Sequence, residues 1–240
     1  MITELRRLWK QAFGDPDSFL DIFFTTAYAA ERCRYLTVDG RLAAALYWFD
    51  CDIDGRKLAY LYAVATDKDF QRQGLCRRLM AGTHEHLRAQ GYAGTILVPG
   101  SQELFRFYEK LGYRICSSVT EFSCVAGTPV SLRPLGAEEY AALRRDYLPF
   151  GGVIQEGPTL EFLSRFADFY AGDGFLLAAS AEDRKARVHE LLGAADAAGI
   201  VAALGAETGS VRTPGSTAPF AMYHSLDGSP APGYFGLALD

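Results

Sequence analysis

The stretch from Tyr60 to Met80 decides the fold and reads YLYAVATDKDFQRQGLCRRLM. Its first part is rich in Tyr, Val and Ala and predicts a strand, whereas Leu75 and Leu79 near its end lie at helical spacing. The polar segment between them, with Gly74 just before the helix, is typical of a tight turn. At such a turn the first N–H groups of the helix have no intrahelical partner. The sequence therefore predicts an anion-binding turn, which the helix dipole strengthens.

Three arginines, Arg72, Arg77 and Arg78, lie around this turn and add positive charge to it. We expect at least one of them to contact a phosphate group; the alternative is that all three are solvated surface charges. Gly74 allows the backbone to come close to a bulky anion such as a pyrophosphate. The stretch has neither the GxxxxGKS/T pattern of a nucleotide P-loop nor the GxGxxG pattern of a dinucleotide fold, so neither class is indicated.

Outward from this stretch, hydrophobic periodicity divides the first half of the chain into helices and strands. The Asp-Gly pairs at 39–40 and 54–55 separate apolar runs, which is typical of tight hairpins and predicts an antiparallel meander. Strands are expected at 34–38, 41–52, 57–66, 95–98 and 113–125, and helices at 5–13, 15–30, 75–91 and 101–111. The resulting order is meander, turn, helix, strand, helix, strand.

A domain boundary is expected near residues 127–129, which read Gly-Thr-Pro, and beyond it the order of elements partly repeats. Strands are expected at 130–135, 175–180, 187–192, 220–225 and 234–239 and near Val211, and helices at 138–147, 159–170 and 195–204. The repeat is one of architecture and not of sequence. The sequence therefore predicts two units, residues 1–126 and residues 127–240.

The composition is that of a globular protein with an apolar core. The chain has 240 residues, 49% of them hydrophobic and 22% charged, and a formal net charge of -5. This charge argues against general nucleic-acid binding, which requires a basic face. The five cysteines form no CxxC pair, and no apolar run approaches the ~20 residues that span a bilayer. We therefore expect a soluble cytoplasmic protein without a disulfide framework, a nucleic-acid partner or a membrane partner.

Residues 71–76, which read QRQGLC, resemble a motif of the GCN5-related N-acetyltransferases, the GNAT family. That family has Gln/Arg-x-x-Gly-x-Gly/Ala between its fourth strand and third helix. Cys76 replaces the usual Gly or Ala at the last position, and a Cys is small enough for a phosphate to come close. Beside this motif, residues 64–66 stand where the family's fourth strand hydrogen-bonds the pantetheine arm of acetyl-CoA.

A second stretch, LFRFYEKLGYRI at 104–115, resembles a downstream motif of the same family. Ser101 stands where the family often has an Asn, Tyr108 matches the family's Tyr, and residues 110–113 close the pattern. The resemblance is specific from about residue 34 to residue 115. Beyond Cys124 it is architectural only.

The resemblance implies an α/β (α+β) protein with the GNAT fold, a mixed, mostly antiparallel sheet flanked by helices, followed by a second, smaller GNAT-like half. The helix expected near Ala195 has no Gln-x-x-Gly signature before it, so the second half is expected to be a degenerate copy that binds no CoA. The first half lacks an obvious first strand, so the second half is expected to complete its sheet.

The activity implied by the resemblance is direct transfer of the acetyl group of acetyl-CoA to an amine, without a metal. The acceptor would be a small molecule or a peptide, and neither its identity nor the oligomeric state is indicated. Tyr108 is expected to protonate the CoA thiolate, and a backbone N–H near Ala65 or Thr66 to stabilise the oxyanion. The general base is not assigned, and the candidates are Tyr62, Glu121 and ordered water.

The residues expected to bind acetyl-CoA lie in both motifs and in the strand before the turn. They are Val64, Ala65, Thr66, Gln71, Arg72, Gln73, Gly74, Leu75, Cys76, Arg77, Ser101 and Phe105.

Several alternatives stand beside this interpretation. The chain could be a non-catalytic acyl-CoA-binding scaffold or sensor, or it could use a larger acyl donor, which the pocket width near Tyr62 and Phe105 would decide. Tyr108 could be a buried core residue, because it shares a helix face with Leu104 and Leu111. Cys76 as a covalent nucleophile is disfavoured because no His is placed nearby to activate it. The aspartates at 50, 52 and 54 predict a charged hairpin and not a calcium loop, and no zinc site is indicated.

Overall fold

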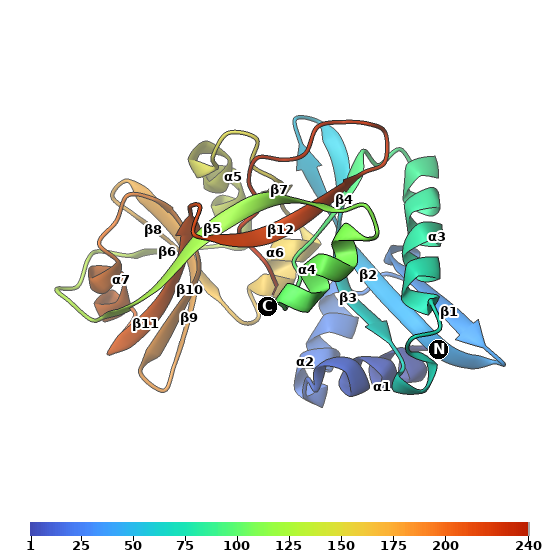
Figure 1. Cartoon of the computed structure of the whole chain (residues 1–240). Coiled ribbons are helices and arrows are strands. Elements are labelled where there is room, and N and C mark those ends of the chain that lie inside the picture. Colours follow the sequence, from blue (N-terminus) through green and yellow to red (C-terminus); the bar gives the residue numbers. More distant parts are fainter. Residues whose placement is uncertain (240) are drawn as a thin grey trace.

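The computed structural model describes residues 1–239 and contains one mixed, mostly antiparallel sheet of 12 strands (Figure 1). The strand order is β1-β2-β3-β4-β12-β5-β11-β10-β9-β8-β6, and β7 pairs with β2 off this path. The strands are β1 (Cys33–Val38), β2 (Arg41–Ile53), β3 (Arg56–Thr66), β4 (Gly94–Leu97), β5 (Arg114–Val125), β6 (Arg133–Leu135), β7 (Ile154–Gln155), β8 (Asp168–Gly172), β9 (Phe175–Glu182), β10 (Lys185–Gly193), β11 (Thr208–Pro214) and β12 (Ala218–Ser225).

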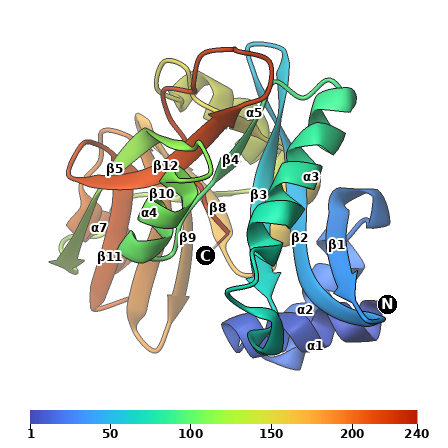
Figure 2. The ribbon, with the colours of Figure 1, turned by 45° about the vertical axis from the view of Figure 1, so that its right-hand side comes forward.

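Helices cover both faces of this sheet. They are α1 (Ile2–Phe13), α2 (Asp17–Ile22), α3 (Leu75–Ala89), α4 (Gln102–Glu109), α5 (Ala137–Tyr147), α6 (Pro158–Leu163) and α7 (Ala197–Ala203). Alternate residues of β2 face opposite sides, and both sides are buried: Tyr47 and Phe49 pack with α1, whereas Leu46 and Trp48 pack with α3. Figure 2 shows α3 running along the strands of the first half. No helix in residues 1–239 is both long and apolar enough to cross a membrane.

The predicted meander is confirmed. β1, β2 and β3 pair antiparallel in sequence order. The Asp39-Gly40 and Asp54-Gly55 pairs both have positive φ angles, between 48° and 76°, as the primed turns of two-residue hairpins require.

β3 and β4 form a parallel pair that is short and then opens. They pair over Leu58, Ala59 and Tyr60 only, and α3 makes the connection between them. Beyond Tyr60 the register of β3 against β2 shifts, with two β3 residues opposite one β2 residue. Ala63 in this bulge has φ 48°, an unusual conformation for a residue with a Cβ. The bulge lies where β3 leaves β4, so it is placed at the opening between the two strands.

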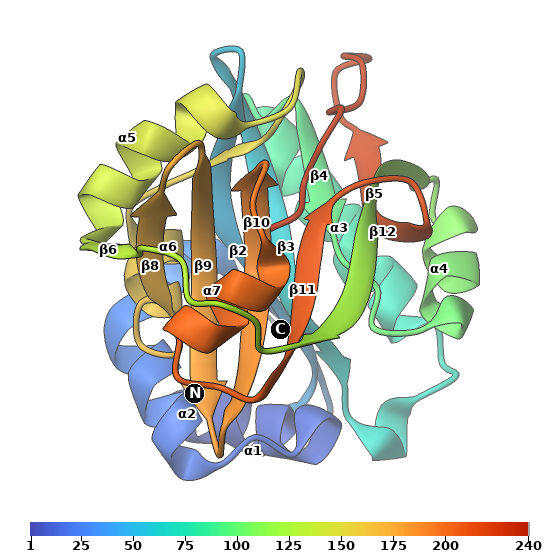
Figure 3. The same cartoon turned by 90° about the vertical axis from the view of Figure 1, so that its left-hand side faces the viewer.

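The second half repeats this unit. β10 and β11 are parallel, pair at residues 185–188 and 208–211, and are connected by α7. β10 also has a register shift against β9, between Val188 and Glu190. Figure 3 shows β8, β9, β10, β11 and β5 side by side with α7 across them. Ile200 of α7 packs there against a cluster that includes Leu177.

The two halves share strands, and so they form one sheet. β12, the last strand of the chain, lies between β4 and β5 and pairs antiparallel with both (Figure 1). The far part of β5 pairs with β11 of the second half. The second half thus completes the sheet of the first. It does so mainly in the middle of the sheet, through β12, while β7 adds a two-residue antiparallel pairing to β2 on the side that carries β1.

Two predicted elements of the second half are wrong. The helix expected at 159–170 ends at Leu163, and β8 begins at Asp168. The strand expected at 234–239 does not form, although this terminal segment is buried. Its backbone is held mainly by side chains: Ser117 Oγ donates to the Phe235 carbonyl at 2.8 Å, and Gln155 Nε2 donates to the Leu237 carbonyl at 2.8 Å. Apolar alternation predicts burial in an extended conformation, but it does not say what supplies the hydrogen bonds.

Candidate functional site

The turn before α3 leaves the N-terminus of that helix open. Gly74 is the N-cap residue with φ 75°, and no side chain caps the helix. Arg72 also has a positive φ, 60°, which turns the chain sharply before the helix. Gln71, Gln73 and Gly74 are all exposed. The first N–H groups of α3 are therefore available to an anion, as the sequence predicts for this turn.

A buried carboxylate holds the segment just before this turn in place. Asp67 is fully buried, accepts a hydrogen bond from the Asp69 N–H at 3.0 Å and pairs with Arg7 of α1 at 2.8 Å. Gln11 of α1 accepts a hydrogen bond from the Lys68 N–H at 3.2 Å. Burial opposes ionisation of Asp67, but the hydrogen bonds from Asp69 and Arg7 outweigh it, so its pKa lies below the usual value. Through Arg7 and Gln11, helix α1 thus holds the segment before the turn in position.

Of the other motif residues, the arginines face solvent and the apolar ones pack inward. Arg72, Arg77 and Arg78 are exposed around the turn. Leu75 is buried in the cluster beneath α3, and Cys76 is partly buried beside it. Burial raises the pKa of the Cys76 thiol to about 11, so it stays protonated at neutral pH and is a poor nucleophile.

A cavity with a volume of about 770 Å³ begins at the opening between β3 and β4. Its first part is lined by residues of the two strands and of the loop and helix that follow β4. They are Leu61, Tyr62, Ala63, Val64, Leu97, Val98, Pro99, Gly100, Ser101, Leu104 and Tyr108. This first part is called the strand opening below.

Tyr108 lies in the wall of the strand opening. It is on α4, which Ser101 caps by accepting a hydrogen bond from the Leu104 N–H at 3.3 Å. Its side chain is 7% exposed, and its ring packs against Tyr113. Burial, and secondly the nearby Cys76, raise the pKa of Tyr108, so the phenol is protonated at neutral pH and can donate its proton. The residue is both part of the core and a lining residue of the cavity.

The structure divides the remaining predicted residues into lining and packing positions. Val64 lines the strand opening, whereas Ala65 and Thr66 pair in register with β2 and are not among its lining residues. Phe105 packs in the core beneath α4, and its neighbour Leu104 lines the opening instead. One residue of difference along a helix turns a side chain by about 100°.

The second part of the cavity is built by both halves of the chain and is called the aromatic chamber below. It is lined by Trp9, Ala12, Phe13, Asp15, Phe19, Tyr60, Val119, Glu121, Arg212, Ala218, Pro219, Phe220, Ala238 and Leu239. Arg212 Nε donates to Glu121 at 2.6 Å, and the guanidinium lies 4.4 Å from the ring centre of Phe220. Tyr62 reaches the chamber and donates to the Leu239 carbonyl at 3.0 Å. Both candidate bases, Tyr62 and Glu121, therefore line the same cavity.

Sequence reasoning missed the contribution of α1 and Asp15 to this chamber. Trp9 Nε1 donates to Asp15 at 2.7 Å, and Phe13 at the end of α1 stays 47% exposed. The helical spacing of these residues predicts a buried face, which is correct for Leu5 and Leu8. The spacing alone does not show that the last turn of the helix, with Phe13, lies beside a cavity.

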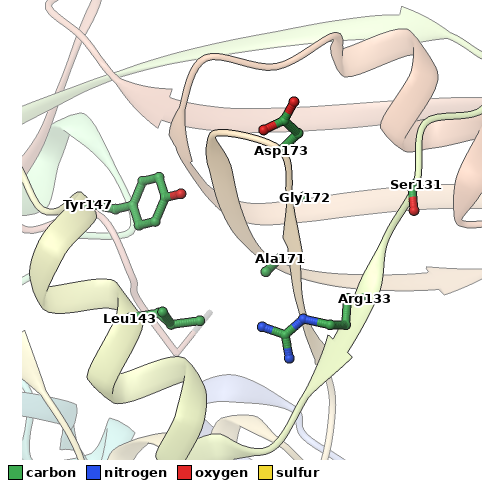
Figure 4. Close-up of a pocket in the computed structure, with 7 residues that line it drawn as sticks. All are labelled: Ser131, Arg133, Leu143, Tyr147, Ala171, Gly172 and Asp173. Atoms are coloured by element: carbon green, nitrogen blue, oxygen red, sulfur yellow. The ribbon is translucent and has the colours of Figure 1, made fainter.

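A second hollow of about 390 Å³ lies in the second half, between α5, β6 and the β8–β9 hairpin (Figure 4). Figure 4 shows Arg133 pointing into it, opposite Leu143 and Tyr147. Arg133 is half exposed and already pairs with Glu139 at 2.7 Å. The hollow therefore has the character of a surface groove. No cluster of three or more metal-binding side chains occurs in residues 1–239.

Comparisons with solved structures identify the fold. A GCN5-related N-acetyltransferase from Kribbella flavida superposes with a TM-score of 0.68, covers 95% of this chain and 70% of its own, and is 19% identical. A GCN5-related N-acetyltransferase from Anabaena variabilis gives a TM-score of 0.69, with coverage of 94% and 70% and 14% identity. Eis1 from Mycobacterium abscessus gives 0.64, with coverage of 92% and 70% and 14% identity. The GNAT-like fold thus extends over both halves.

The fold of the chain is therefore GNAT-like. The family assignment comes from sequence: residues 1–116 match the acetyltransferase (GNAT) domain family, and this part of the chain is a GNAT domain. Members of that family use acetyl-CoA to acetylate amines. No curated protein matches the chain in a sequence search.

Proposed function

We propose that the protein is an N-acetyltransferase that moves the acetyl group of acetyl-CoA directly to an amine. The observation that carries this proposal is the single cavity that joins the strand opening, with Val64 and Tyr108 in its wall, to the aromatic chamber. A direct transfer needs both reactants in one continuous space, because the amine must reach the thioester carbonyl.

The residues present fit acetyl-CoA. The uncapped N-terminus of α3, flanked by Arg72 and Arg77, offers N–H groups and positive charge to the pyrophosphate. The strand opening offers the pantetheine arm a slot beside Val64 where β3 has lost its β4 partner. When bound, acetyl-CoA supplies an activated thioester.

The protein's own groups then act on the transfer. A backbone N–H of residues 63–66 of β3, in the bulge or directly after it, stabilises the negative charge that develops on the carbonyl oxygen. Tyr108 Oη gives its proton to the departing sulfur, since burial keeps the phenol protonated. Tyr62 and Glu121 lie on the acceptor side, where the amine must lose a proton. The remainder of the rate enhancement comes from positioning the amine in the chamber.

The second half is proposed to be a degenerate copy that binds no CoA and forms one wall of the chamber. Asp196 caps α7 by accepting a hydrogen bond from the Ala198 N–H at 3.1 Å, so a carboxylate stands where the first half leaves an open helix end. A bound phosphate would be repelled there. The second half instead supplies Arg212 and Phe220 to the chamber.

The five cysteines are free thiols, and burial raises the pKa of the buried Cys33 and Cys51 to about 12. Free, protonated thiols suit a reducing compartment, and we place the protein in the cytoplasm.

The test is acetyl-CoA binding to the full chain by calorimetry, with Gly74→Glu as the variant. The introduced carboxylate would stand at the phosphate site, and we expect micromolar binding to weaken at least ~100-fold. Gly205→Glu is the matched control, because Gly205 follows α7 with a similar φ of 73° and equally open surroundings. It should fold with the same backbone strain and bind normally.

Two results would overturn the proposal. Absence of binding by the folded protein would contradict the acetyl-CoA site itself. Tight binding with no acetyl transfer to any amine would favour the non-catalytic acyl-CoA scaffold or sensor.

A further inference from the structure

We infer that the acceptor is a monoamine carried on an aromatic or branched apolar body, bound in the aromatic chamber. This inference rests on the proposed acetyl transfer for its chemistry. The observations that carry it are the rings of the chamber wall, one of which is about half exposed, and the small number of charged residues among them.

Four rings form a continuous wall on one side of the chamber. The ring centre of Trp9 lies 5.8 Å from that of Phe13, 6.1 Å from Phe19 and 5.6 Å from Tyr62. The contacts are edge-to-face or tilted, so the rings support each other's orientation. A wall of this kind is preformed, so a ligand can pack on its apolar surface without rearrangement of the rings.

Phe13 is the exposed member of this wall. It is 47% exposed at the last position of α1, whereas Trp9 is buried on the same helix. Gly14 ends the helix directly after it, and its amide donates back to Lys10 at 3.0 Å, which fixes the position of Phe13. The ring therefore lines the chamber as an apolar surface open to a ligand. Covering that surface with another apolar group is favourable, because it removes the surface from water.

Charge in the chamber is sparse. Among the described lining residues only Asp15, Glu121 and Arg212 are charged, and the last two pair with each other at 2.6 Å. Asp15 is held by the Trp9 indole at 2.7 Å, which is a neutral donor and leaves the carboxylate charge in place. One carboxylate beside aromatic faces suits one ammonium group, through an ion pair and cation–π contact. That ammonium must lose its proton before it reacts.

The same wall disfavours the other large classes of amine. A polyamine would bring further ammonium groups for which the lining has no second unpaired carboxylate, and an amino sugar would place hydroxyl groups against the rings. Buried polar groups without a hydrogen-bond partner are costly, whereas an aromatic or branched alkyl body has none to satisfy. Phe220 and Pro219 of the second half add further apolar surface to the lining.

Binding is measured separately from turnover, with Trp9 as the reporter. Trp9 and Trp48 are the two tryptophans of the chain, so Trp48→Phe leaves the fluorescence to the chamber wall. In this background, with CoA present, 2-phenylethylamine should change the Trp9 emission in a saturable way. Spermidine should require at least ~10-fold higher concentration. Phe13→Ala should weaken 2-phenylethylamine binding ~10-fold, and so should Asp15→Asn.

The matched controls are Phe150→Ala and Asp183→Asn, which remove an exposed ring and an exposed carboxylate outside the chamber. Neither should change the fluorescence titration. If spermidine binds as well as 2-phenylethylamine, or if Phe13→Ala leaves the affinity unchanged, the inferred class of ligand is wrong.

Turnover of the same amines with acetyl-CoA tests the proposed function. If 2-phenylethylamine binds in a Phe13-dependent manner and is acetylated with a kcat/KM at least ~10-fold above that of spermidine, both conclusions stand. If it binds in that manner and no amine is acetylated, the class of ligand stands and the transferase activity fails. If spermidine is the better substrate, the activity stands and the inferred class of acceptor fails.

Discussion

The chain contains the same crossover twice, β3-α3-β4 and β10-α7-β11, and the two copies differ at the places where a ligand would bind. In both, two parallel strands pair briefly and are joined by a helix. In both, the first strand has a register shift against its antiparallel neighbour. The backbone frame is therefore shared, and the differences lie in the residues at its end.

The first difference is at the helix N-terminus. α3 has 15 residues and begins at Gly74 without a side-chain cap, whereas α7 has 7 residues and is capped by Asp196. A glycine leaves the helix N–H groups to an external anion, and an aspartate satisfies one of them internally. The residue at the N-cap, Gly74 or Asp196, thus decides whether the helix N-terminus is open to an external anion.

The second difference follows the register shift. In β3 the residue after Ala63 is Val64, which lines the cavity. In β10 the corresponding region carries Glu190, fully buried and paired with Arg144 at 2.6 Å and 2.9 Å. In the second copy, the Arg144–Glu190 ion pair thus occupies the region after the register shift. In the first copy, the corresponding region borders the cavity. A binding site of this kind arises where the fold leaves groups without internal partners.

The largest expected effect is that of Tyr108→Phe, which removes the proposed proton donor from the first copy of the crossover, called the open copy below; the second is called the closed copy. We expect kcat to fall ~10²–10⁴-fold, provided that chemistry limits turnover, while acetyl-CoA affinity changes less than about twofold. Steady-state kinetics with calorimetry separate the two. Tyr140→Phe is the matched change in the second half, where the phenol donates to Glu190 at 3.3 Å, and it should leave kcat unchanged. Equal rates for wild type and Tyr108→Phe would remove Tyr108 from the mechanism.

Breaking the ion pair of the closed copy should destabilise the whole chain. Arg144→Met leaves Glu190 buried without its cation, and we expect unfolding to become easier by about 3–5 kcal/mol in a denaturant titration. Arg144→Met with Glu190→Leu removes both charges and should recover most of that loss. A single variant as stable as the wild type would mean that the second copy does not depend on this pair.

A buried histidine should make the stability of the first copy depend on pH. His84 of α3 is buried against Tyr113 and Thr95, with His224 and Arg88 nearby. Burial, and then those two neighbours, lower the pKa of His84 to about 3. Below the unfolded pKa of about 6.5 the unfolded chain binds a proton that the folded one does not, so stability is full above that pH and falls below it.

Between pH 7.5 and pH 5 we expect His84 to reduce the unfolding free energy by about 1–2 kcal/mol. His84→Gln retains a polar group for Tyr113 and should remove that dependence. Urea titrations at both pH values provide the measurement. An unchanged pH dependence in the variant would assign it to other groups.

The smallest expected effect concerns the cap of the closed copy. Asp196→Ala removes the cap of α7, and we expect a loss of about 1 kcal/mol of stability with no gain of acetyl-CoA binding at that helix. One binding site per chain in calorimetry, before and after the change, is the expected result. A second site in the variant would show that Asp196 alone had closed the second copy.

Local features of this protein could be read from its sequence because local residues determine them. The Asp-Gly hairpins at 39–40 and 54–55 and the turn before α3 each depend on a few adjacent residues. The same holds for the place of Tyr108 on α4, although its contact with the cavity required the structure.

Features that depend on distant residues could not be read in this way. The pattern of 220–225 predicts a strand, yet nothing in it shows that β12 lies between β4 and β5. The bracing of the turn by Arg7 and Asp67 joins positions 60 residues apart. Residues near both ends of the chain line the chamber. They meet only because the chain folds into one sheet, so no local motif could have predicted this lining.

The central place of β12 has a consequence for how the protein is made. β4 is synthesised roughly 120 residues before β12, which at about 5–20 residues per second is a wait of about 6–24 s on the ribosome. During that time the facing edges of β4 and β5 have no strand between them, and open edges invite pairing with other chains. The nascent GNAT domain therefore depends on the late arrival of its own last strand. A protein truncated after the first half would lack β12, the strand between β4 and β5.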